Sequence, residues 1–193
     1  LSGEGADEVF GGYKRFYDIQ YPFSVNRLLT ELNRNLNNPS EVFRYFLDNR
    51  QRAIMSNAYM TPFLAGRLMR NFSRDRAISD RLALYNILSG SGFDKQVKYE
   101  MKTFLPDLLI RQDKMSMAHS IENRVPFLDI EVVNGAFSIP EQFLMLRDSP
   151  NGKNTEKYLL KKMTAVVFGE DFAFRKKMGF GIPVKEFFSD EKF

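Results

Sequence analysis

Apolar residues recur at helical spacing along most of the chain. The first such stretch follows the i, i+3, i+4, i+7, i+11 pattern of one helix face, at Val25, Leu28, Leu29, Leu32 and Leu36. The same spacing predicts further helices over residues 78–90, 94–104, 106–123, 130–137 and 153–168. Because no run of alternating apolar and polar residues is long enough to predict a strand, the pattern predicts a mainly α chain.

Two helix starts carry recognisable capping sequences. Asn38 is suited to cap a helix that has Pro39 in its first position and Glu41 as the reciprocal partner of a capping box. Thr61 and Pro62 repeat the arrangement of a cap followed by proline. These signals strengthen the helical interpretation of the first third of the chain.

Composition limits the chemistry more than it limits the fold. The chain has 193 residues, of which 44% are hydrophobic, and this suits one globular domain. Without cysteine there is no disulfide, cysteine-ligated zinc or cysteine nucleophile within these residues, and the single histidine, His119, argues against a histidine metal site or a catalytic triad. Any catalysis must therefore depend on carboxylates, lysine, arginine and the backbone.

Charge and hydropathy indicate the kinds of partner to expect. The net charge of +4 is too small, and the arginines too scattered among acids, to predict a nucleic-acid surface. No apolar run approaches the roughly 18–20 residues of a membrane span, and no signal peptide is evident. We expect a cytoplasmic protein that binds neither membrane nor nucleic acid.

The stretch "LSGEGADEVFGGY" combines glycines with acids. Its glycines are Gly3, Gly5, Gly11 and Gly12, and its acids are Glu4, Asp7 and Glu8. A turn followed by a capped helix is one interpretation of this pattern. The other is a ligand loop, since a helix starting near Ala6 would direct free N–H groups at an anion, and Asp7 in its first turn could hold Mg²⁺ beside a phosphate.

A second stretch, "RQDKMSMAHSIENRVPFLD", interrupts an apolar segment with charged residues. By pattern alone it is a helix with one face in water, in which Met115 and Met117 fill the core. We expect His119 to be a surface or capping residue. Asp129 follows the turn and is expected to cap the short helix that ends near Phe137.

The C-terminal segment is basic, with seven basic and three acidic residues between Lys153 and Lys177. Lys157, Lys161 and Lys162 are expected on a solvated helix face. The stretch "RKKMGFGIP" differs, because two glycines flank Phe180 and make the setting of its cations flexible and non-helical.

These three stretches, in this order, resemble the synthetase domain of glutamine-dependent asparagine synthetases. The family's motifs are matched by "SGEGADE", by "RQDK" with "MA" and "RVPFLD", and by "RKKMGF". The resemblance covers nearly the whole chain. It implies the helical C-terminal portion of an α/β PP-loop synthetase domain whose parallel sheet is largely missing here, with a nucleotide-site loop and first helix over 1–17 and a helical region over 18–193.

The resemblance also implies an activity, in which ATP and Mg²⁺ activate the side chain of aspartate as an acyl-adenylate. Ammonia, released from glutamine by a separate N-terminal domain, then displaces AMP to give asparagine. By the family's motifs Ser2 and Gly3 contact the nucleotide and Asp7 holds Mg-pyrophosphate. Glu4 and Asp113 organise the adenylate and the amine, and Lys177 stabilises the transition state.

The chain departs from the family in what its 193 residues contain. The pyrophosphate loop Ser-Gly-Gly-x-Asp-Ser, the glutaminase cysteine and the parallel strands are all absent from them. We therefore expect the isolated chain to be inactive. We also expect an exposed apolar face where the sheet would pack, which could drive self-association into a homo-oligomer.

Two alternatives remain at this stage. Related adenylating enzymes act on other carboxylates, among them beta-lactam synthetases, lasso-peptide cyclases and sugar-modifying amidotransferases. Glu4 argues against the beta-lactam type, where a tyrosine is expected, but not against the others. The second alternative is a helical binding module without chemistry.

Overall fold

The computed structural model describes residues 1–16, 49–58, 60, 62–146 and 155–176. These residues belong to two compact units, Leu1–Leu159 and Leu160–Phe193, with the division inside a helix. The helices expected over 25–36 and after Asn38, the cap Thr61 and the site residue Lys177 lie outside the described residues.

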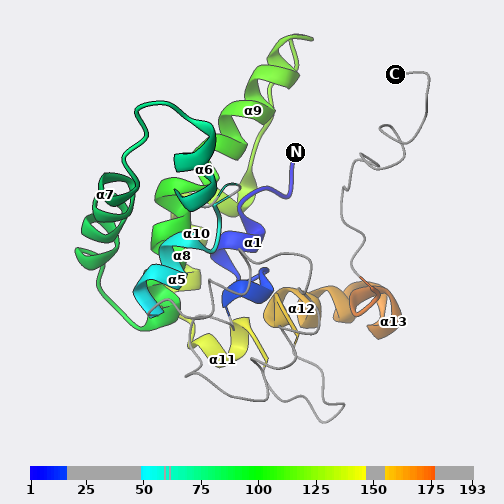
Figure 1. Ribbon diagram of the computed structural model, residues 1–193. Coiled ribbons are helices and arrows are strands. Elements are labelled where there is room, and N and C mark those ends of the chain that lie inside the picture. The colour runs from blue at the N-terminus through cyan, green and yellow to red at the C-terminus, as the bar shows by residue number, and fades with distance from the viewer. Residues whose placement is uncertain (17–48, 59, 61, 147–154, 177–193) are drawn as a thin grey trace, which may run out of the picture. The chain divides into compact units, whose positions relative to one another are not determined.

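Helices form nearly all the regular structure of the described residues (Figure 1). The first unit contains α1 (Ala6–Val9), α5 (Asn49–Met55), α6 (Pro62–Leu68), α7 (Arg74–Asn86), α8 (Gly92–Thr103), α9 (Leu105–Met117), the 3-10 helix η1 (Pro126–Leu128), α10 (Ile130–Ser138) and α11 (Glu141–Leu144). Helix α12 (Tyr158–Phe168) crosses the division, and α13 (Glu170–Ala173) follows it. Within the described residues the β-pairing consists of one isolated antiparallel bridge between Leu146 and Thr155, so the mainly α prediction is confirmed.

Local sequence explains where several helices begin. Helix α6 begins at Pro62, as predicted. Helix α8 begins two residues before its predicted start because Ser91 and Asp94 form a capping box, with reciprocal hydrogen bonds of 3.1 and 2.9 Å. The cap predicted at Asp129 is confirmed, since its side chain accepts a hydrogen bond of 2.9 Å from the N–H of Glu131.

Four predicted boundaries are wrong, including the start of α7, which is at Arg74 rather than 78. Helix α9 ends at Met117 rather than near 123, because Ser120 is left-handed (φ 57°) and the N–H of Ile121 returns to the Ser116 carbonyl. Helix α7 ends at Asn86, before the predicted Gly90. Helix α12 begins at Tyr158 rather than at 153, because Thr155 bridges to Leu146 and Lys157 has a left-handed backbone (φ 51°).

The two methionines of α9 are also not core residues in this chain. Met115 is 74% exposed and Met117 is 52% exposed, and Ile110 on the same helix is 54% exposed. Met115 and Met117 are two positions apart and therefore lie on different sides of the helix, and the described residues leave both side chains more than half exposed.

The core of the first unit joins α5, α7 and α8. Ile54 and Tyr99 are fully buried, and the rings of Tyr85 and Tyr99 meet edge to face with centroids 5.7 Å apart. Aromatic rings also pack beneath the N-terminal segment, where Phe16 meets Phe93 edge to face at 5.8 Å. The segment that carries the glycine loop is thus anchored on α8.

A buried ion pair fixes this anchor. Arg15 donates two hydrogen bonds to Glu100 on α8, and the Nε–Oε1 bond is 2.7 Å long. The Glu100 side chain is completely buried, whereas that of Arg15 is 24% exposed. Gln96 adds a bond of 2.8 Å to Oε1 of Glu100. Burial acts to lower the pKa of Arg15, but the hydrogen bond and charge of Glu100 outweigh it and raise that pKa.

We predict that Arg15→Met lowers the free energy of unfolding by about 3 kcal/mol, because it leaves the Glu100 carboxylate buried without its cation. Lys14→Met is the matched control at the exposed neighbouring position and should change stability by less than about 0.5 kcal/mol. Urea unfolding followed by circular dichroism measures both. Equal midpoints for the two variants would show that the pair does not anchor the segment.

Candidate functional site

The loop "SGEGADE" turns sharply at Gly5. Its φ of 86° is left-handed, and a Cβ at this position would lie 2.3 Å from Leu128 Cδ2. Helix α1 begins at the next residue, Ala6, as predicted, and places Asp7 in its first turn. Because α1 has only four residues, its dipole gives little support to the expected anion site.

Ser2 ties the loop to two other parts of the chain. Its N–H donates to the Arg124 carbonyl at 2.8 Å, just before η1. Its hydroxyl oxygen accepts from the N–H of Glu4 at 3.1 Å and from Nε2 of Gln112, on α9, at 2.9 Å. The next residue, Gly3, is exposed, and a Cβ there would meet no atom within 4 Å. Of the two predicted nucleotide residues, Ser2 is therefore held by hydrogen bonds, whereas Gly3 has open space beside it.

Asp7 forms an ion pair that the sequence did not indicate. Lys157 Nζ lies 2.8 Å from Asp7 Oδ1, and each side chain is 26% exposed. Lys157 has a left-handed backbone (φ 51°), and its N–H donates to the Gly11 carbonyl at 3.2 Å. The expectation that Lys157 belongs to a solvated helix face is therefore wrong. Periodicity carries no signal for such a contact, because the two residues lie about 150 positions apart in the chain.

Asp7 is the loop carboxylate predicted to hold a metal ion. Among the described residues no group of three or more histidine, aspartate or glutamate side chains could hold a metal ion. Mg²⁺ often takes one or two carboxylates together with phosphate oxygens and water, so Asp7 fits a metal–phosphate complex. A cation at Oδ1 would compete with Lys157 for this oxygen.

Glu4 and Asp113, two of the predicted catalytic residues, are not joined by a hydrogen bond in the described structure. Glu4 is partly buried in the loop, and Asp113 is exposed on α9, directly after Gln112. Among the described residues, the hydrogen bond between α9 and the loop is made by Gln112 to Ser2, and none joins Asp113 to Glu4. Glu122 and Arg124, just before η1, form an ion pair with the two charged atoms 2.8 Å apart.

Glu8 is the acid of this loop that points into the protein. Its side chain is buried, and the Tyr13 hydroxyl donates to Oε1 at 2.6 Å. Burial raises the pKa of Glu8, and the bond from Tyr13 offsets part of that effect. Glu8 therefore stabilises the loop from the protein interior and is not exposed to a ligand.

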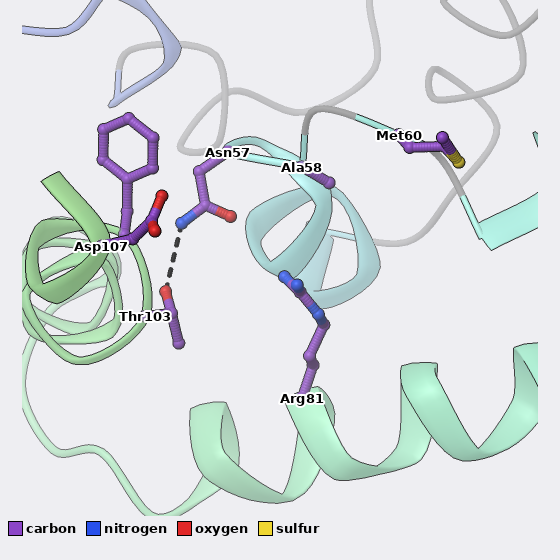
Figure 2. Close-up of a pocket in the computed structure, with 7 residues that line it drawn as sticks. Asn57, Ala58, Met60, Arg81, Thr103 and Asp107 are labelled. Atoms are coloured by element: carbon purple, nitrogen blue, oxygen red, sulfur yellow. Dashed lines mark hydrogen bonds between the residues drawn. The ribbon is translucent and has the colours of Figure 1, made fainter. Parts of the chain in front are cut away.

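A cavity of about 260 Å³ lies elsewhere in the first unit, between the end of α5, α7 and the junction of α8 with α9. Figure 2 shows Asn57 directed at Thr103, to which it donates a hydrogen bond of 3.1 Å. Arg81 bonds to the Ile54 carbonyl, and Asp107 pairs with Arg111 at 2.9 Å. These polar groups already have partners within the protein. No predicted site residue lines the cavity, so the cavity is separate from the glycine loop.

Comparison with known proteins identifies the class. A family model described as asparagine synthase matches residues 1–192, so the chain belongs to the asparagine synthase family. No solved structure matches the chain. None of the helices in the described ranges is long and apolar enough to cross a membrane.

Individual relatives support the same family. The chain is 30% identical over 205 residues to asparagine synthetase [glutamine-hydrolyzing] 1 of Bacillus subtilis, covering 99% of this chain and 32% of that protein. It is 31% identical to asparagine synthetase [glutamine-hydrolyzing] 3 of the same organism, covering 92% and 25%. Amidase chry2 of Gibberella zeae is 24% identical, covering 84% and 28%. The chain thus spans a third or less of the length of these relatives.

We predict that stability depends on pH through Glu8. Because its pKa is raised in the folded state, the native protein binds more protons than the unfolded chain above about pH 4.5, and stability falls as pH rises through the folded pKa. Glu8→Gln retains an acceptor for Tyr13 and should flatten this part of the profile. Urea midpoints between pH 4.5 and 7.5 test it, and identical slopes for wild type and variant would contradict it.

We also predict that Gly12→Ala destabilises the loop while Gly3→Ala does not. A Cβ at Gly12 would lie 1.8 Å from Asp7 Oδ1 and 2.6 Å from Asp7 Cα, so the backbone must shift, at a cost of about 1–3 kcal/mol. The open space at Gly3 limits its change to about 0.5 kcal/mol. Thermal unfolding distinguishes the two, and a Gly12→Ala variant as stable as Gly3→Ala would refute the packing argument.

Proposed function

We propose that this chain forms one wall of the adenylation site of an ATP-dependent amide synthetase that converts aspartate to asparagine with ammonia from glutamine. The observation that carries the proposal is the family match over residues 1–192, which includes the loop that holds Ser2, Gly3 and Asp7. The relatives named as glutamine-hydrolysing asparagine synthetases support the same substrates.

The proposed reaction has two steps. A side-chain carboxylate oxygen of aspartate attacks the α-phosphorus of ATP, and the bond to the bridging oxygen breaks so that pyrophosphate leaves. The nitrogen of ammonia then attacks the acyl carbon of β-aspartyl-AMP; AMP departs with the bonding electrons, and the nitrogen loses a proton. Such chemistry depends mainly on positioning the reactants and stabilising developing charge.

Each predicted site residue, in the loop or outside it, has a role in this scheme. Ser2 and Gly3 would contact the nucleotide, which agrees with the open side of the loop at Gly3. Asp7 would hold Mg²⁺, which would neutralise charge on the departing pyrophosphate. Glu4 and Asp113 would orient the acyl group and the amine, and Lys177 would stabilise the charge that grows in the transition state.

The proposal treats the chain as part of a larger site. The Ser-Gly-Gly-x-Asp-Ser loop of the family does not occur in these residues, so the second half of the phosphate cradle and the glutaminase function would come from other sequence. The exposed side chains of α9 suit packing against that sequence or, in the chain alone, self-association. The chain alone would then bind ligands without turnover.

A second candidate is a related adenylating enzyme that acts on a different carboxylate, from a sugar, a peptide or a secondary metabolite. Amidase chry2 supports this candidate, because it matches 84% of the chain and is not named as an asparagine synthetase. The two candidates share the nucleotide chemistry and differ in the acceptor alone.

We predict that the 193-residue chain binds AMP and, with Mg²⁺, pyrophosphate, as measured by isothermal titration calorimetry. Asp7→Asn should weaken Mg-pyrophosphate binding about tenfold, because a charged metal ligand becomes neutral, while leaving AMP affinity within about twofold. Asp75→Asn, at a 90% exposed carboxylate, is the matched control.

The same preparation, supplied with aspartate, Mg²⁺ and ATP, should show no ATP–pyrophosphate exchange. Turnover at a rate typical of a ligase would refute the proposal that the site is incomplete. A binding module without chemistry would show no Mg²⁺-dependent affinity, and Asp7→Asn would change nothing.

A further inference from the structure

The hydroxyl of Ser2 receives hydrogen bonds from two directions. The N–H of Glu4 donates to it at 3.1 Å from within the loop, and Nε2 of Gln112 donates at 2.9 Å from α9. A serine hydroxyl has two lone pairs and one hydrogen. With both lone pairs engaged by these donors, the remaining capacity of Ser2 is to donate its own hydrogen.

We infer that Gln112 is a positioning residue that makes Ser2 a dedicated hydrogen-bond donor to an acceptor atom of the bound nucleotide. The inference rests on the proposed function, which puts the nucleotide against Ser2 and Gly3. It adds Gln112 to the predicted site residues and specifies that Ser2 donates the hydrogen bond to the nucleotide. A ligand atom at this point must accept a hydrogen bond, so a ring nitrogen, a ribose oxygen or a phosphate oxygen would suit it.

The geometry fixes both ends of this arrangement. The backbone of Ser2 is tied to the Arg124 carbonyl at 2.8 Å, so the hydroxyl starts from a defined position. Gln112 lies within the long helix α9, in which side chains are held more rigidly than in loops. Beside them, Gly3 is exposed with open space around it, which leaves room for a ligand next to the hydroxyl.

The orientation of the Gln112 amide follows from its surroundings. Its Oε1 is buried and accepts no hydrogen bond from the described residues. Turning the amide over would put the NH₂ group in that buried place, where neither of its N–H donors has a partner among the described residues, whereas in the present orientation one of them bonds to Ser2. An unpaired buried N–H is rarer and costlier than a partly satisfied carbonyl, so the orientation with Nε2 toward Ser2 is favoured.

Two substitutions separate the direction of the hydrogen bond from simple packing. Gln112→Met approximately preserves length and volume but cannot donate, and its sulfur accepts only weakly, so Ser2 keeps its hydrogen but loses its orientation. Gln112→Glu preserves shape, but an ionised carboxylate can only accept. The Ser2 hydrogen would then turn to the carboxylate and leave no donor for a ligand.

The direction of the bond can be tested without ligand. In ¹⁵N–¹H spectra of the 193-residue chain, Ser2→Ala should move one of the two side-chain amide protons of Gln112 upfield and speed its exchange with water. An unchanged Gln112 amide signal would overturn the inference, because it would mean that Nε2 does not donate to Ser2.

The consequence for binding is tested with AMP by isothermal titration calorimetry. We expect affinity to fall about threefold in Gln112→Met and at least about tenfold in Gln112→Glu, the order that loss of orientation and loss of the donor predict. Gln142→Glu, at an exposed position of α11, adds the same charge elsewhere and should leave affinity within about twofold.

The outcomes distinguish the inference from the proposed function. If wild type binds AMP and both Gln112 variants bind as well as wild type, or Gln112→Met is as weak as Gln112→Glu, the inference fails and the nucleotide site stands. If wild type does not bind AMP, the proposed nucleotide site fails, and the inference about its donor fails with it.

Discussion

The described structure around the glycine loop depends on the buried pair of Arg15 and Glu100. A carboxylate that is completely buried requires a cation and further hydrogen bonds, and Arg15 meets that need from the N-terminal segment. The requirement fixes the distance and direction of this segment relative to α8. The bond between Tyr13 and Glu8 joins two residues within the same segment and so stiffens the loop internally.

From this base the loop divides its residues between two environments. Gly5 and Glu8 face the interior. A side chain at Gly5 would collide with Leu128, and the carboxylate of Glu8 is buried. Ser2, Gly3 and Asp7 keep some exposure, and contacts from separate segments hold two of them: α9 holds Ser2, and Lys157 just before α12 holds Asp7. A loop of this kind can present a few polar groups at fixed positions, as a site for phosphate chemistry requires.

The two supporting residues, Gln112 and Lys157, share a feature. Each is a polar residue that was not predicted as part of the site, and each contacts a loop residue of the proposed site. Their contacts give the loop a defined hydrogen-bond direction at Ser2 and a counter-charge at Asp7. Gln112 lies between Arg111 and Asp113 of the quoted "RQDK" stretch, and Lys157 lies outside the quoted stretches; neither was among the predicted site residues.

The sequence by itself determined the mainly α class, the helix starts at Pro62 and after Asp129, and the family, because capping and periodicity are local and motifs are read directly. It misplaced the ends of α9 and the start of α12, since a left-handed Ser120 and the pairing of Leu146 with Thr155 depend on neighbours in space. It also could not tell that Glu8 is buried, that Lys157 reaches Asp7, or that Gln112 rather than Asp113 bonds to the loop. Only the tertiary structure decided these contacts, because residues about 110 and 150 positions apart meet only once the intervening helices have packed.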